Sequence, residues 1–162
     1  MSSTLFVDAI EPNLSSGVHI PGHVVQVVKA SSTASTSLSS PAVDTWTSVN
    51  PSISITPKYN NSMIIIHHYA GGLANNTAGT KLRLLRNGSP IVTNDRHSYV
   101  DSANIWMPMS WTSVWTDTPS TTSALTYTLQ IGCQASTGGL LRHNDYQATA
   151  NTAFTIAMEI AQ

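Results

Sequence analysis

Histidines are the side chains in this sequence best suited to hold a metal ion or to move a proton near neutral pH. His19 and His23 flank an Ile-Pro-Gly turn, and three copies of such a loop around a trimer axis could gather enough imidazoles for a transition metal. His67 and His68 are adjacent in an extended apolar run, so they point to opposite faces of a strand and cannot both ligate one ion from one chain. The favoured interpretation needs no metal: His19 and His23 lie on a loop, and His67 or His68 packs at a subunit interface through a hydrogen bond.

Carboxylates are the other candidates for chemistry, because a hydrolase of surface polysaccharides would place two of them beside a sugar. Here they are isolated, mostly in expected loops, and no spacing brings two of them together. The glycine patterns of a nucleophile elbow, a phosphate-binding loop or a dinucleotide fold are also absent. The sequence therefore predicts a protein that is not an enzyme and needs no cofactor. The remaining histidines, His97 and His143, are predicted to be solvated. The eight acidic residues are Asp8, Glu11, Asp44, Asp95, Asp101, Asp117, Asp145 and Glu159.

Three of the four tryptophans cluster in one segment, from Ile105 to Trp115. Met107, Met109 and Trp111 share one face of the expected strand, and this face is predicted to be core or subunit interface. Trp106 falls on the other face, where its ring could stack on a sugar. The candidate recognition patch is therefore made of Asp101, Asn104 and Trp106.

The elements that must position these residues are organised around a pair of strands. Ile53 and Ile55 alternate with serines, which indicates a strand with one wet face, and a turn then leads to an apolar run from Met63 to Tyr69. Both faces of this second strand are apolar and need cover, either inside a sandwich or from a neighbouring subunit. The residues predicted to form the subunit interface are Ile64, Ile66 and His68.

Further strands are predicted on both sides of this pair. Asn87-Gly88 is a strong hairpin signal, because a two-residue type I′ turn needs positive φ at both positions. Cys133 is in phase with inward residues, which predicts a buried free thiol. No segment carries a capped helical pattern longer than about two turns. The chain is thus predicted to be all-β, an antiparallel β-sandwich of jelly-roll-like topology. The other expected strands are 24–28, 81–86 with 91–92, 105–115, 125–133 and 154–160, and residues 95–104 are expected to form a long loop.

Composition and the N-terminus bound the possible functions. Only 9% of the 162 residues are charged and the formal net charge is −1, so no basic footprint for nucleic acid is present. No apolar run approaches the roughly 20 residues of a membrane-spanning helix, and no secretion signal is recognisable. Residues 1–22 are predicted to form a docking arm and residues 23–162 the sandwich domain. The apolar residues of the arm are Leu5, Phe6, Val7 and Ile10.

Several of these segments together resemble small virion surface proteins of tailed bacteriophages, especially the β-rich domains of tail fibres. The resemblance rests on VDAIEPN, IPGHVVQVV, SITPKYNNSMIII, LRLLRNGSPIV, TYTLQIGCQ and the terminal IAMEIA, and it covers the chain from Leu5 to Ala161. It implies a homotrimeric structural protein of the virion, assembled in the host cytoplasm. Its role would be that of a short tail fibre in host attachment. The alternative is a capsid decoration (cement) protein that stabilises the head shell. The implied partners are further copies of the chain, baseplate, tail or major capsid proteins, and a host surface glycan.

Overall fold

The computed structural model describes residues 20–75, 79–99, 106–135, 139–146 and 149–162, and in these ranges the chain forms strands and no helix. No helix of the described residues is therefore long and apolar enough to span a membrane. The all-β prediction is confirmed. The strands are β1 (Val24–Ser32), β2 (Thr36–Ser39), β3 (Trp46–Ser48), β4 (Ile53–Ile55), β5 (Met63–Asn75), β6 (Gly79–Arg86), β7 (Ser89–Tyr99), β8 (Trp106–Asp117), β9 (Leu125–Ala135), β10 (Leu140–His143), β11 (Asp145–Tyr146), β12 (Thr149–Ala150) and β13 (Ala153–Ile160).

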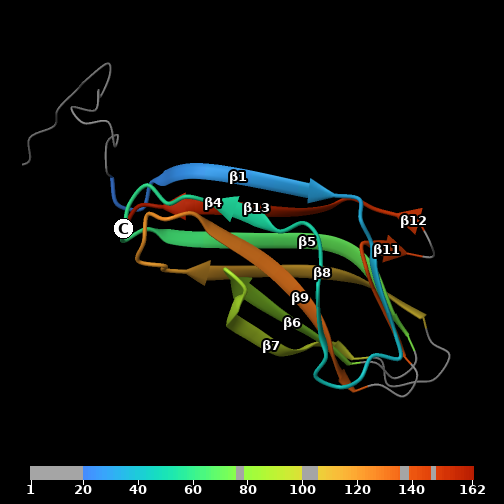
Figure 1. The fold of residues 1–162 in the computed structure, drawn as a ribbon. Helices are drawn as coiled ribbons and strands as arrows, with labels where there is room; N and C mark the ends of the chain where they lie inside the picture. Colours follow the sequence, from blue (N-terminus) through green and yellow to red (C-terminus); the bar gives the residue numbers. More distant parts are fainter. Residues whose placement is uncertain (1–19, 76–78, 100–105, 136–138, 147–148) are drawn as a thin grey trace, which may run out of the picture.

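Two large antiparallel sheets pack against each other, as Figure 1 shows, and β11 and β12 form a small separate sheet. In the first sheet β5 pairs with β8 along its whole length on one side, and with β13 and then β10 on the other. β1 lies beyond β13, and β2 lies beyond β10. The second sheet has the order β7, β6, β9, with β3 and β4 both on the far side of β9. This order, with β1/β2, β3/β4 and β10/β13 each taken as one interrupted strand, is that of a jelly roll, so the predicted fold class holds.

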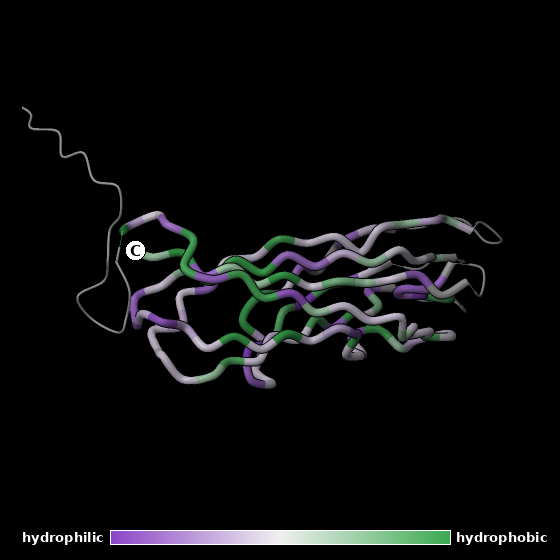
Figure 2. Tube along the Cα trace, turned by 90° about the horizontal axis from the view of Figure 1, so that it is seen from above, coloured by the Kyte–Doolittle hydropathy of each residue, from purple (hydrophilic) through white to green (hydrophobic). Residues whose placement is uncertain are grey.

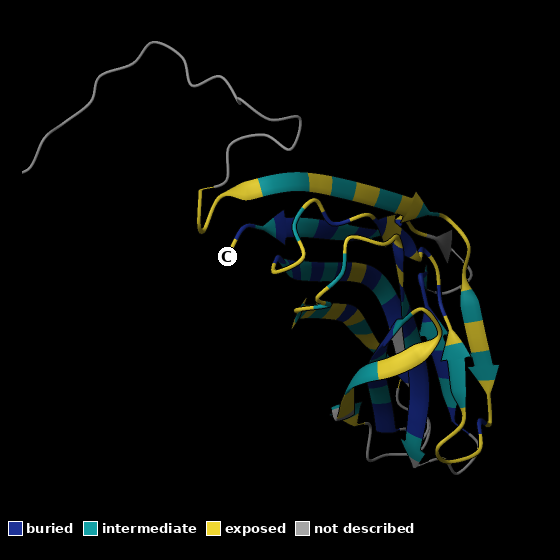
Figure 3. Ribbon diagram, turned by 60° about the vertical axis from the view of Figure 1, so that its left-hand side comes forward, coloured by how far each residue is buried: buried dark blue, intermediate teal, exposed yellow. Residues whose placement is uncertain are grey.

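Side chains of β5 alternate between the two faces, and the even-numbered ones point into the core. Ile64 and Ile66 are at most 1% exposed and pack with Leu84, Tyr127 and other residues of the second sheet. The banding of buried and less buried residues along the strands is visible in Figure 3. The subunit interface predicted at Ile64, Ile66 and His68 is therefore wrong, because a single chain already buries these three side chains.

β13 follows the same register as β5. Ala157 lies opposite Ile66 and is buried, whereas Ile156 and Met158 lie opposite His67 and Ile65 and are only half-buried. The larger apolar side chains of β13 therefore point away from the core, to the outer face of the first sheet.

The hairpin between β6 and β7 is confirmed, since Asn87 and Gly88 have φ of 50° and 83°. The expected long loop at 95–104 is wrong in its first half, because β7 continues to Tyr99. Cys133 is a buried free cysteine, as predicted.

Glu159 fixes the loop between β4 and β5 to the first sheet, although it is a fully buried carboxylate. Its Oε1 accepts hydrogen bonds from the Lys58 and Tyr59 backbone N–H groups at 2.7 and 3.1 Å and from the Ser62 hydroxyl at 2.6 Å. Gln26 Nε2 donates to Oε2 at 2.6 Å. Burial by itself raises the pKa of this carboxyl, but the hydrogen bonds outweigh burial and lower the pKa.

Candidate functional site

The outer face of the first sheet is apolar where β1, β13, β5 and β8 lie side by side. Val27 and Val114 are 58% and 60% exposed on it, and Lys29 places its Nζ 5.6 Å from the ring centre of Phe154. Figure 2 shows hydrophobic stretches alternating with hydrophilic ones along these strands. We name this surface the outer apolar face. Its residues are Val27, Met63, Ile65, His67, Val114, Phe154, Ile156, Met158 and Ile160, and Tyr69 marks its border.

The outer apolar face is large for the surface of a lone subunit. Four strands spaced about 4.8 Å apart, each contributing about seven residues at roughly 3.4 Å per residue, cover about 450 Å² in projection. The apolar side chains are densest on β5 and β13, while β1 and β8 also place Lys29, Thr112 and Thr116 on this face. Contiguous apolar patches beyond a few hundred Å² usually mark interaction surfaces. A sheet face of this kind is what assembly with another protein surface would cover.

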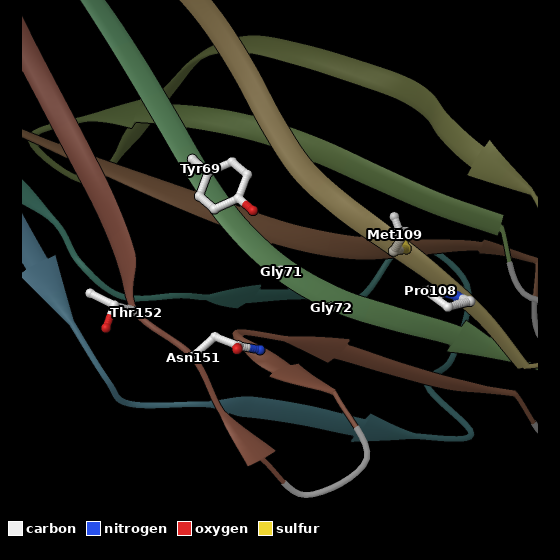
Figure 4. A pocket seen from close by; sticks show the side chains of 7 residues that line it. All are labelled: Tyr69, Gly71, Gly72, Pro108, Met109, Asn151 and Thr152. Carbon is white, nitrogen blue, oxygen red and sulfur yellow. The ribbon is translucent and has the colours of Figure 1, made fainter.

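An open pocket of about 480 Å³ lies on the same side of the sheet, toward the C-terminal end of β5. It forms at a break in the neighbouring strand: β13 pairs with β5 as far as Tyr69, and β10 takes over from Gly72. Figure 4 shows the floor formed by the glycines of β5, between β8 and the segment that leads into β13. The lining residues are Tyr69, Gly71, Gly72, Pro108, Met109, Asn151 and Thr152.

The ring of Tyr69 is held in place by its neighbour. It stacks on Phe154 with a centroid distance of 5.3 Å and an interplanar angle of 25°. Tyr69 as a whole is 39% exposed. Within the described chain, the side chains of Asn151 and Thr152 make no hydrogen bond, so their amide and hydroxyl are free to meet a ligand.

A buried pair of histidines lies behind this surface, inside the core. Thr155 Oγ1 donates to the Pro51 carbonyl at 2.9 Å, so it accepts from His68 Nδ1–H, also at 2.9 Å. His68 Nε2 then carries the lone pair and accepts from His143 Nε2–H at 2.9 Å. His68 is therefore neutral in this arrangement.

Burial lowers the pKa of both imidazoles, because neither charged form would be solvated. The pKa of His68 falls to about 3, with the charges of His143 and then His67 lowering it further. The pKa of His143 falls to about 4 through burial. The prediction that His143 is solvated is wrong: the residue is 0% exposed. His97, predicted to be solvated too, is only partly exposed and stacks on Trp111 at 5.7 Å and 9°.

The predicted recognition patch is described only at Trp106. Asp101 and Asn104 lie outside the described residues, as do the arm residues Leu5, Phe6, Val7 and Ile10 and the loop histidine His19. Trp106 is 50% exposed, on the outer side of β8 as predicted, with the Arg142 guanidinium 6.0 Å from its ring centre. Trp111 is fully buried, also as predicted. His23 is exposed, and the described residues contain no group of three or more metal-ligating side chains.

The pocket residues were missed by sequence reasoning. Asn151 and Thr152 are small polar residues without a motif around them. The one available signal was the Gly71-Gly72 pair inside an apolar strand, since glycine in a strand marks a bulge or a place that is left open.

Comparison with known proteins gives no family for the chain. No family model matches it, and no curated protein matches it. Among solved structures, the VP2 subviral particle of infectious bursal disease virus overlaps 98% of this chain and 42% of its own, with 12% identity and a TM-score of 0.45. The T13 particle of the same virus overlaps 97% and 40%, with 12% identity and a TM-score of 0.43. Dimeric latent PorU from Porphyromonas gingivalis overlaps 91% and 14%, with 8% identity and a TM-score of 0.37.

The chain thus spans about two fifths of the length of the viral proteins it overlaps. The jelly-roll assignment rests on the strand order of the chain itself.

Proposed function

We propose that the chain is a structural protein on the outside of a bacteriophage particle, a short homotrimeric tail fibre that contributes to host attachment. The observation that carries the proposal is the outer apolar face. Together with the jelly-roll topology and the sequence resemblance to phage surface proteins, it supports a subunit that works in an assembly.

A second copy of the chain is the favoured occupant of this face. Stable interfaces bury about 800 Å² on each partner, and the face supplies roughly 450 Å² in projection before the relief of its side chains is counted. It carries few charges, as the centres of subunit interfaces do. In a trimer the outer apolar face of each subunit meets a different patch of its neighbour, so each subunit takes part in two contacts.

The mechanism is binding geometry and requires neither catalysis nor a cofactor. Three identical weak contacts on one rigid trimer reinforce one another through effective concentration. The arm, residues 1–22, would join the trimer to the particle, and the sandwich would face outward toward the host.

The second candidate is a capsid decoration protein that stabilises the head shell. It is favoured by one sequence observation: the chain has no heptad segment and no fibrous repeat of the kind a long fibre carries. Both roles need a trimer and an arm.

Gold labelling of intact particles with an antibody against this protein separates the candidates. Label at the tail end supports the fibre, label over the head supports the decoration protein, and unlabelled particles would refute both. Deleting residues 1–11 should release a folded trimer from the tail in the first case and give fragile capsids in the second. Sedimentation of the purified chain as a monomer would refute the trimer.

A further inference from the structure

We infer that the pocket between Tyr69, Pro108 and Asn151 is a binding site for a neutral saccharide. The inference deepens the proposed attachment role by naming the site and the chemical class of its ligand. It rests on the two glycines of the pocket floor, on the groups of its walls and on the break in the sheet where it lies.

Gly72 is required by the fold, whereas Gly71 is not. A Cβ on Gly72 would collide with the Arg142 carbonyl and with Trp111 Nε1, which are themselves hydrogen-bonded to each other at 2.8 Å. A Cβ on Gly71 would meet only the Asn151 side chain, with Nδ2 at 3.4 Å as an ordinary contact, and the backbone there does not have positive φ. Neither packing nor conformation explains why position 71 lacks a side chain.

Glycine weakens a strand, so its presence at position 71 calls for a reason outside stability. Gly71 follows Met63, Ile65, His67 and Tyr69 on the outward side of β5, where each of the others carries a large side chain. A side chain at position 71 would point into the pocket. The absence of a side chain therefore keeps the space above the strand open.

The walls suit a ligand that has both an apolar face and hydroxyl groups. Tyr69 offers an aromatic ring already fixed by Phe154, so little side-chain freedom is lost on binding. Pro108 adds a second flat apolar surface, while the amide of Asn151 and the hydroxyl of Thr152 supply donors and acceptors. A pyranose ring has this combination, because its axial C–H bonds form an apolar face and its hydroxyls lie around the rim.

The charge and size of the pocket further restrict the chemical class of the ligand. The lining contains no Asp, Glu, Lys, Arg or His, so nothing in it would compensate an ionic ligand. A volume of about 480 Å³ is in the range of sites for small molecules. The pocket is open at the surface, which suits one or two sugar units of a longer glycan.

Saturation-transfer NMR on the purified full-length chain tests the site. The probes are the methyl glycosides of glucose, galactose, mannose and N-acetylglucosamine at millimolar concentration. We expect transfer to the ring protons of at least one glycoside, loss of that transfer in Gly71→Val and Tyr69→Ala, and at least a several-fold decrease in Asn151→Ala. Thr93→Val, an exposed change on β7 of the other sheet, is the matched control and should bind like the wild type.

Gly71→Val is the decisive variant because valine favours strands and its Cβ would meet only the exposed Asn151 side chain, which can turn away from the added methyls. The protein should therefore remain folded with the pocket filled. Its far-ultraviolet circular dichroism should match the wild type. Absence of transfer from all four glycosides, or undiminished transfer with Gly71→Val, would overturn the inference. Neither result depends on where the protein sits in the particle, so gold labelling can support the proposed function while this site fails, or the reverse.

Discussion

Mild acid should destabilise the domain through its buried histidine pair, before carboxylates take part. The folded state holds His68 and His143 neutral, with pKa values of about 3 and 4 against 6.5 for an ordinary histidine. Between these values the unfolded chain binds protons that the folded chain does not, so stability falls as pH falls. The stability contributed by the neutral pair is fully present above pH 6.5 and is progressively lost toward pH 3.

The magnitude follows from the same pKa values. At pH 5 each histidine that stays neutral only in the folded state costs roughly 2 kcal/mol of stability, and two independent ones would cost about 4 kcal/mol. Because the rings share one N–H···N bond, they titrate as a coupled pair, and the loss should lie between these two figures. A domain with 5–15 kcal/mol of total stability would lose a large part of it.

The groups around the pair make the acid response specific to it. Thr155, Trp111 and the Pro51 carbonyl are the neighbours that do not titrate here, and His67 is the nearby group whose charge acts on His68. Glu159 is a separate source of acid sensitivity. Its pKa is lowered from an ordinary 4.5, so its contribution is lost only below that value. The window between pH 6.5 and pH 5 therefore reports the histidines.

Urea unfolding followed by tryptophan fluorescence, at fixed protein concentration and between about pH 7.5 and pH 5, measures the effect. His143→Gln removes one titrating ring and keeps an N–H donor toward His68, so it should reduce the pH dependence by about half. His23→Gln changes an exposed histidine and is the control. Stability that stays level over this window, or that falls equally in His143→Gln, would refute the neutral pair.

Three further predictions test the sheet faces and the buried carboxylate. Ile66→Ala should cost about 2–5 kcal/mol in urea unfolding because Ile66 is 1% exposed in the core, whereas Ile65→Ala on the outer face should cost about 1 kcal/mol or less under monomeric conditions; equal costs would contradict the register. Met158→Glu should abolish the trimer in analytical ultracentrifugation and leave the circular dichroism unchanged, with Thr93→Glu on β7 as the control that still assembles. Glu159→Gln should destabilise the fold by about 1–3 kcal/mol at pH 7, since an amide replaces an acceptor of four hydrogen bonds; a stability equal to the wild type in urea unfolding would show that the loop does not depend on this carboxylate.

Most strands of the jelly roll could be predicted because they carry a local signal, whereas the short strands β2, β3, β10, β11 and β12 were not predicted. Alternation at Ile53 and Ile55, the Asn87-Gly88 turn and the run ending at Cys133 are all properties of short segments. The side of the sheet on which each residue lies was harder to predict. Met63 and Ile65 are as apolar as Ile64 and Ile66, so the pattern of β5 fits either register, and one position of shift exchanges the two faces.

The long-range polar contacts could not be predicted at all. His68 and His143 are 75 residues apart, and Glu159 lies 97 residues from Ser62. The sequence predicted His143 to be solvated and His68 to lie at a subunit interface, and both are buried inside one chain. Their burial depends on the register between strands that are far apart in sequence, and that register is set by packing of the whole sandwich.

The adjacent glycines of β5 show how structure separates two causes that sequence presents as one. In the sequence Gly71-Gly72 is a single feature that suggests flexibility. In the fold Gly72 leaves room for Trp111 and the Arg142 carbonyl, so replacing it must disturb the core, while Gly71 opens onto the pocket with an ordinary contact at 3.4 Å. Stability explains the first glycine. Gly71 costs stability and leaves open an uncharged pocket beside the Tyr69 ring, on the same side of the sheet as the outer apolar face. We therefore place ligand recognition in the pocket and self-association on the outer apolar face beside it.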